Sequence, residues 1–449
     1  MNYGDISGPF EVSVQLEGDS AFRSLGWNAA LPSGTGRWVP VPAEARSVRI
    51  DGVEAALEYD RRNNTVRTSG LLRRVEPLEL KLLTGLEQPY RTTIGYLPIV
   101  GWNLYDGWMP GIAVHNEVLP LRDWGWHVAP MWSFGEDELM GFARLSRRMG
   151  SWVARAEARR FAAPAVVPGW EQEVYRRAAL VAEARFHKKP ASPWSSAVRF
   201  EAADLRSDAT LYGMENALTV LPPRNARQSL GAIGSATWKG RSTSHSLRAE
   251  VRGFAFDQAY DEVLLLRSDE RALFASITYA GAYRYDRDGH KVRWRVFGGN
   301  STDATVFPVL VQGIASGVDP MRDQLFLSRE GEGVAGAQVA ELHGGLSGFA
   351  SDRSAASVVT ASVDVDLPAK LGVFAGAGVA EDWIGSAGVF VRLPSLQGPG
   401  DMQSSIRIPL AATGWFEPGM TYRPWEYIAI QFSINVLNPF TLVRSAVQP

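Results

Sequence analysis

The fold is decided by the stretch Trp152-Val153-Ala154-Arg155-Ala156-Glu157-Ala158-Arg159, in which two chemistries alternate. One set of residues is apolar or small, and the other set contains Arg155, Glu157 and Arg159. A period of two belongs to an extended strand, because its successive side chains point to opposite faces of the sheet. Such a strand suits a membrane barrel, with one face toward lipid and the other toward a wet lumen.

The same alternation recurs further along the chain. Leu247, Ala249 and Val251 alternate with Arg248, Glu250 and Arg252. Residues 359–366 and 428–436 also place aliphatic residues on one face and polar residues on the other. Within residues 124–132, the three tryptophans share one face. This repetition predicts a sheet of many amphipathic strands, although the core of a soluble β-sandwich would use the same faces.

From residue 91 onward, amphipathic segments of about ten residues are separated by Gly, Asp or Pro, which is typical of membrane barrel strands. The composition of residues 171–187 favours a helix, but the segments on both sides have a period of two, so we predict a strand here. Residues 286–289 predict a hairpin turn between strands over 272–285 and 291–298. We therefore predict an all-β fold, a transmembrane antiparallel β-barrel of about sixteen strands preceded by a small soluble β segment.

The N-terminal part shows a different pattern. Short strands are predicted over residues 10–16, 37–41, 47–50 and 65–68, with a turn at 62–64, as in a small soluble sandwich. The predicted domains are residues 1–90, expected in the periplasm, and residues 91–449, the outer-membrane barrel. The start lacks the basic and apolar regions of a signal peptide, so we expect a mature or truncated piece of a longer precursor.

The composition excludes several classes of function. The 46 basic and 48 acidic residues give a net charge of −2, which does not support nucleic-acid binding. No window offers the roughly 18 consecutive apolar residues that a spanning helix needs. The absence of Cys excludes disulfides, thiolate metal sites and a cysteine nucleophile. The 15 Trp, 13 Tyr and 19 Phe fit the aromatic girdles of membrane barrels.

No motif in the chain carries chemistry. Residues 331–336 match GxGxxG, but no βαβ unit surrounds them, so we interpret them as a flexible loop. The motifs GxxxxGK[ST], GxSxG and HExxH do not occur. The histidines are isolated in sequence, at His115, His127, His187, His245, His290 and His343. We therefore predict no catalytic residue, no cofactor and no metal site.

The charged strand faces are the candidate functional feature. The side chains expected to face the lumen are Arg155, Glu157, Arg159, Arg248, Glu250 and Arg252. One interpretation is a charged lumen that selects solutes. The other, which we favour, is that the charges neutralise one another inside a plugged barrel.

Two stretches carry a family resemblance: Gly101-Trp102-Asn103-Leu104-Tyr105-Asp106-Gly107-Trp108-Met109 and Ala129-Pro130-Met131-Trp132-Ser133-Phe134-Gly135. Here, and at residues 60–71, 317–329 and 437–440, the chain resembles the C-terminal outer-membrane barrel of gluzincin (alanyl-aminopeptidase-like) metallopeptidases. The resemblance extends over nearly the whole chain after about residue 45. It implies a zinc domain upstream, and because HExxH is absent here, no peptidase activity belongs to these residues.

A looser resemblance begins at Gly344-Gly345-Leu346-Ser347-Gly348-Phe349 and continues through the strands after it. It is to bacterial surface-antigen barrels, the outer-membrane assembly and two-partner-secretion translocators. The resemblance implies about eleven strands before this loop and five after it, with an inward-folded loop marked by Gly344, Gly345, Gly348 and Phe349. The translocators carry an arginine where Ser347 stands here, so an arginine lock on the lumen wall is not expected.

The leading hypothesis is a non-catalytic barrel in the bacterial outer membrane that anchors, or is a conduit for, a peptidase-like region. The alternatives are a translocator or assembly barrel for protein insertion or secretion, a passive pore, and a soluble all-β binding protein. The expected partners are outer-membrane lipid, the barrel assembly machinery during biogenesis, and a peptidase-like domain in the same polypeptide.

Overall fold

A computed structural model describes residues 7–52, 64–69, 73, 78–83, 91–103, 105–118, 122–164, 172–187, 192–207, 225–259, 267–302, 313–314, 327–328, 346, 354–380, 382–392, 405–412 and 429–431. The chain divides into two compact units, Met1–Tyr96 with Val114–Arg122, and Leu97–Ala113 with Asp123–Pro449. The predicted division at residue 90 stays a prediction. Among the described residues, no helix is long and apolar enough to cross a membrane.

The N-terminal strands form one antiparallel sheet in the order β2-β1-β3-β4. The strands are β1 (Phe10–Leu16), β2 (Arg23–Asn28), β3 (Ala45–Ile50) and β4 (Thr65–Arg67). The prediction of a strand over residues 37–41 is wrong, because that segment is irregular. Pro40 and Pro42 cannot donate hydrogen bonds to a neighbouring strand, which accounts for the difference.

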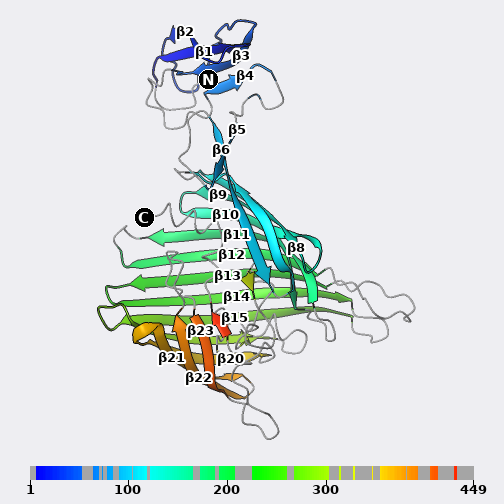
Figure 1. The fold of residues 1–449 in the computed structure, drawn as a ribbon, viewed down its shortest axis with the longest axis vertical. Coiled ribbons are helices and arrows are strands. Elements are labelled where there is room, and N and C mark those ends of the chain that lie inside the picture. Colours follow the sequence, from blue (N-terminus) through cyan, green and yellow to red (C-terminus); the bar gives the residue numbers. More distant parts are fainter. Residues whose placement is uncertain are drawn as a thin grey trace, which may run out of the picture. The chain divides into compact units, whose positions relative to one another are not determined.

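Long antiparallel strands make up most of a closed barrel, and Figure 1 shows several of them side by side. The first eleven are β6 (Thr92–Asn103), β7 (Gly107–His115), β8 (Trp124–Ser133), β9 (Glu138–Met149), β10 (Trp152–Pro164), β11 (Gln172–His187), β12 (Trp194–Ser207), β13 (Asn225–Lys239), β14 (Thr243–Ala259), β15 (Arg267–Arg284) and β16 (Lys291–Ser301). Five more follow, β20 (Ser357–Asp366), β21 (Leu371–Ala380), β22 (Trp383–Arg392), β23 (Ser405–Ala412) and β24 (Ala429–Gln431).

These sixteen strands confirm the predicted barrel. Eleven of them precede residues 344–349 in the sequence and five follow. The strand predicted over residues 171–187 is confirmed for Gln172–His187, which form β11 and pair with β10 and β12. Here tertiary pairing overrides helix propensity. The predicted hairpin at residues 286–289 is also confirmed, since Arg284 pairs with Lys291.

Shorter elements complete the described part of the chain. They are β5 (Leu78–Leu82), β17 (Gly313–Ile314), β18 (Leu327–Ser328), β19 (Ser354–Ala355) and a 3-10 turn, η1 (Pro368–Lys370). β17 pairs with β19, whereas β5 and β18 both run parallel to β6. A parallel neighbour is unusual in a barrel of antiparallel hairpins.

The outer face of the barrel is apolar. Leu180 and Leu230 are 66% and 70% exposed, although both lie in the middle of long strands. The predicted apolar faces of β14 and β20 are exposed as well, with Val251 and Val359 pointing outward. Soluble proteins rarely expose large apolar patches, so an apolar face on strands of this length is expected to contact the lipid of a membrane.

An aromatic row runs along the outer face near one end of the strands. Trp194 pairs in register with Trp238, and Trp238 pairs with His245. His245 stacks on Tyr279, whose hydroxyl lies 2.8 Å from His245 Nδ1. Amphipathic aromatic rings of this kind collect at the level of the lipid headgroups. The fold and its apolar, aromatic-bordered surface are those of a bacterial outer-membrane barrel.

Candidate functional site in the barrel lumen

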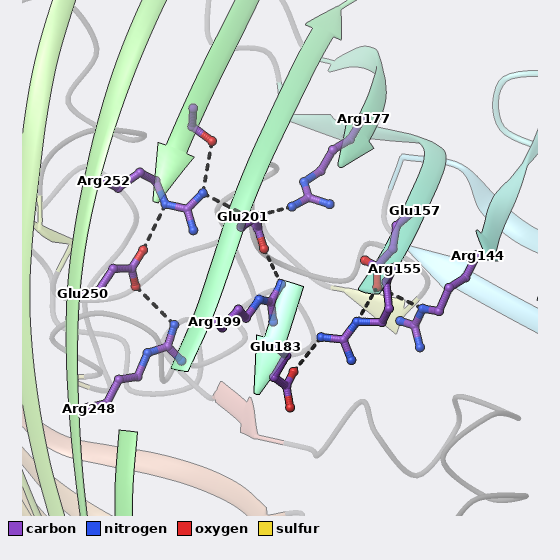
Figure 2. Close-up of polar contacts among 11 residues, drawn as sticks. Arg144, Arg155, Glu157, Arg177, Glu183, Arg199, Glu201, Arg248, Glu250 and Arg252 are labelled. Carbon is purple, nitrogen blue, oxygen red and sulfur yellow. Dashed lines mark hydrogen bonds and ion pairs between the residues drawn. The ribbon is translucent and has the colours of Figure 1, made fainter. Parts of the chain in front are cut away.

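Five of the six charges that the sequence singled out form ion pairs within and between strands (Figure 2). They are Arg155, Glu157, Arg248, Glu250 and Arg252. Glu157 Oε1 lies 2.9 Å from Arg144 Nε on β9 and 3.7 Å from Arg155 Nε on β10 itself. Arg155 Nη2 lies 2.7 Å from Glu183 Oε2 on β11. Antiparallel register brings these residues together, since side chains on one face of adjacent strands are neighbours.

Glu201 on β12 occupies the centre of the network. Its Oε1 lies 2.8 Å from Arg177 Nη2 and 3.1 Å from Arg252 Nη1, and Arg252 Nε lies 3.0 Å from Glu250 Oε1. These four side chains are buried, with at most 4% of their surface exposed. Buried charges require partners, and two arginines with two glutamates leave this centre neutral.

The rim of the network is more accessible and more basic. Arg248 Nη2 lies 3.2 Å from Glu250 Oε2, and Arg199 pairs with Glu201, both from partly exposed positions. Arg159 is half-buried opposite Arg177 in the register of β10 and β11. The ten residues labelled in Figure 2 comprise six arginines and four glutamates. These residues thus carry two more positive than negative charges, and both interpretations, mutual neutralisation and solute selection, stay hypotheses.

An apolar layer adjoins this network on the inner face, and the sequence patterns did not reveal it. It gathers inward residues from the strand ends beside the β6–β7 and β8–β9 turns. The layer includes Met109, Met131, Met140, Phe161, Tyr175, Leu205, Phe254, Phe274, Phe297, Val358 and Ile384. On β10, for example, Phe161 lies on the same face of the strand as Arg155 and Glu157. Lumens of open porins are polar, so this layer marks a packed interior.

Leu346 joins the apolar layer from the segment between β16 and β20. It is 1% exposed, and a Cβ on Gly376 of β21 would lie 2.5 Å from its Cδ2. The Leu346 side chain would therefore have to shift if position 376 carried a Cβ. The predicted loop residues Gly344, Gly345, Gly348 and Phe349 lie outside the described residues. The described residue between them, Leu346, is packed inside the barrel.

A second ionic cluster surrounds Asp366 at the end of β20. Its Oδ1 lies 2.9 Å from Arg293 Nη1 and also pairs with Arg392, while its Oδ2 accepts a bond from the Lys291 N–H. On the same strand, Asp364 pairs with Arg407 of β23. Both aspartates belong to the polar row of residues 359–366, but their partners are distant in sequence. Only strand order could reveal this cluster.

The two stretches behind the peptidase-linked resemblance interlock at neighbouring turns. Asp106 Oδ2 accepts bonds from Asn103 Nδ2 at 2.5 Å and from the Ala162 N–H at 2.9 Å. The Asp106 carbonyl accepts bonds from Ser133 Oγ and the Gly135 N–H. Burial raises the pKa of the Asp106 carboxyl above its usual range, although the bonds from Asn103 and Ala162 oppose this. Residues of these two motifs therefore stabilise the β6–β7 and β8–β9 turns by hydrogen bonds between them.

Of the histidines in the described part of the chain, His290 lies in a group of side chains that could hold a metal ion, and the others do not. His115 and His127 are buried and separate, and His245 belongs to the outer aromatic row. Asp286, Asp288 and His290 come within 4.8 Å of one another in the β15–β16 turn. His290 there bonds to Asp286 through both its ring and its backbone N–H, which is a turn-stabilising arrangement.

Comparison with known proteins gives remote similarities only. No protein family and no curated protein matches the chain. Among solved structures, the chain is similar to BamA from Haemophilus ducreyi lacking POTRA domains 1–3, with TM-score 0.41 and 10% identity over 76% of this chain and 71% of that one. CdiB from Acinetobacter baumannii gives 0.36 and 10%, over 73% and 60%. The copper transporter OprC gives 0.31 and 11%, over 70% and 52%.

Proposed function

We propose that this chain is a translocator or assembly barrel of the bacterial outer membrane, which inserts or passes polypeptide and has no catalytic centre of its own. The observation that carries the proposal is the occupied interior. A barrel of sixteen to eighteen strands ordinarily encloses a water-filled channel. Here an apolar layer, a paired ionic network and Leu346 fill described parts of the inner face.

A filled lumen favours a gated polypeptide-handling barrel over a passive pore. A porin keeps a polar inner wall so that solutes diffuse through, whereas this inner wall contains Phe274, Phe297 and Leu346, each almost fully buried. Apolar side chains at a constriction exclude water and ions. Passage of material therefore requires these side chains, Leu346 among them, to move, or the barrel wall to open.

The peptidase-anchoring hypothesis receives no support from the described residues. Its two motifs form the hydrogen bonds of the β6–β7 and β8–β9 turns, which is a structural role. Sequencing the gene upstream provides its direct test, because the hypothesis requires an in-frame domain with HExxH. Without such a domain, anchoring a peptidase in the same polypeptide is ruled out.

The proposed function is tested by reconstitution. The full chain is incorporated into vesicles, and an unfolded outer-membrane barrel protein is added as client. We expect faster client folding than in protein-free vesicles, measured by heat-dependent gel mobility. In planar bilayers we expect only brief, small openings. A large steady conductance without any effect on the client would establish a passive pore instead.

A further inference from the structure

The excess positive charge of the ionic network is confined to one part of it. Among the residues labelled in Figure 2, Glu157 and Glu183 are balanced by two arginines, Arg144 and Arg155. The two other glutamates, Glu201 and Glu250, are shared by four arginines, which are Arg177, Arg199, Arg248 and Arg252. Four arginines against two glutamates leave an excess of two positive charges among these residues, whereas the whole chain has a net charge of −2.

Two of these four arginines are accessible to solvent. The side chains of Arg177 and Arg252 are at most 4% exposed, and both pair with Glu201 Oε1. In contrast, the side chains of Arg199 and Arg248 are 35% and 41% exposed. Because buried charges need partners most, the glutamates serve the buried arginines first, and the excess charge lies at Arg199 and Arg248.

Strand β13 lies between the two accessible arginines. Arg199 of β12 pairs in register with Ile233, and Arg248 of β14 pairs with Ser235. Neighbouring strands are about 4.8 Å apart, so the backbones of β12 and β14 are separated by roughly 10 Å. Two arginine side chains are long enough to span this separation around a bound ion. The half-buried Ser235 lies on the same face between them and adds a hydroxyl donor.

Two arginine donors of the network have no acceptor in the described part of the chain. Arg199 Nη2 pairs with Glu201, but Arg199 Nε is buried and has no hydrogen-bond partner among the described residues. The same holds there for Nε of Arg177, whose side chain is 4% exposed. Buried donors in proteins nearly always have a partner, and an ion can supply it. The donors and the excess charge together point to a bound anion.

We propose that Arg199 and Arg248, with the Ser235 hydroxyl, form an oxyanion site on the lumen wall that binds a dianionic phosphate group. Guanidinium groups donate paired N–H bonds to phosphate, and a dianion matches the excess of two positive charges. A tetrahedral phosphate keeps a further oxygen for the hydroxyl. Inorganic phosphate and the phosphate of a small monoester share this chemistry. The inference goes beyond the proposed function, because it assigns a small ligand to the lumen.

The test measures binding of inorganic phosphate to the full chain in detergent by calorimetry, with phosphate replacing chloride at constant ionic strength. Arg199→Gln and Arg248→Gln should each weaken phosphate binding about tenfold, because each removes charge-assisted hydrogen bonds. Ser235→Ala, which removes a neutral donor, should weaken it about threefold. Arg206→Gln is the matched control, since Arg206 lies on the same strand as Arg199, is 66% exposed and pairs with Asp204. Its phosphate affinity should equal that of the wild type.

A second pair of variants keeps the test valid if a glutamine variant does not fold. Arg199→Lys and Arg248→Lys retain the charges that pair with Glu201 and Glu250 but remove the planar guanidinium. We expect wild-type heat-dependent gel mobility and a phosphate affinity between those of the wild type and the glutamine variants. Saturating phosphate should also raise the urea midpoint of the wild type more than that of Arg199→Lys, because a ligand that binds only the folded state stabilises it.

Competing anions identify the ligand. Glycerol phosphate that displaces inorganic phosphate would extend the site to monoesters, and its failure to do so would confine the site to the inorganic ion; both results retain the site. Acetate that competes as well as phosphate at equal ionic strength would overturn the assignment of a dianion. No saturable phosphate binding, or equal binding by the wild type, Arg199→Gln and Arg248→Gln, would overturn the site itself. None of these outcomes depends on whether the chain accelerates client folding.

Discussion

Replacing Glu201 by glutamine should lower the free energy of unfolding of the barrel substantially, although the two side chains have nearly the same size and shape. The carboxylate lies 2.8 Å from Arg177 Nη2 and 3.1 Å from Arg252 Nη1, and all three side chains are buried. Arg252 keeps Glu250 at 3.0 Å, but Arg177 has no second ion pair among the described residues. Removing one partner of a buried pair costs about 3–5 kcal/mol. The glutamine oxygen keeps one acceptor, so we expect about 3 kcal/mol.

The assay is urea unfolding of the full barrel in lipid vesicles, followed by tryptophan fluorescence. A lower midpoint with an unchanged slope reports a loss of stability. Asp204→Asn, on the same strand, is the matched control, because its partner Arg206 is 66% exposed and such pairs contribute about 0–1 kcal/mol. High salt should weaken only the control pair, since buried pairs are poorly screened.

A double variant completes the test. Arg177→Gln combined with Glu201→Gln should cost less than the two single changes added together, because the partners contact each other. The reasoning is refuted if Glu201→Gln shifts the midpoint no more than Asp204→Asn. Additive single effects would likewise show that the pair contributes nothing.

Three further predictions concern single positions. Gly135→Ala should cost about 1–3 kcal/mol by overpacking, because the new Cβ would lie 2.2 Å from the Tyr105 carbonyl, whereas Gly234→Ala, with open space around it, should be neutral in the same urea assay. Gly376→Val should displace the Leu346 side chain, whose Cδ2 would lie 2.5 Å from a Cβ at position 376, and so lower the midpoint of urea unfolding, and an unchanged midpoint would contradict this packing. Burial raises the pKa of Asp106 above its ordinary 3.8, so protonation favours the folded state. Wild-type stability relative to Asp106→Asn should therefore rise as the pH falls from neutral through that raised pKa, and a flat difference would contradict it.

The alternation of charged with small residues, as at Arg155 and Glu157, was enough to predict strands and a barrel, whereas the number of about sixteen came from counting such runs along the chain. This succeeds because the period of two is local, and each strand shows it independently of its neighbours. The ambiguous residues 171–187 were resolved in the same way, by their context. Local chemistry failed at residues 37–41, where two prolines prevent pairing.

The sequence by itself determined the fold class, the membrane-facing surface and which charges share a face. Only the tertiary structure decided that Glu201 and Asp366 are each shared among arginines of several strands, and that Leu346 packs against Gly376. The parallel pairing of β5 with β6 and the hydrogen bond between His115 and Leu83 are also visible only in the tertiary structure. Strand order and register bring these residues together, and neither can be deduced from the spacing of residues within a strand.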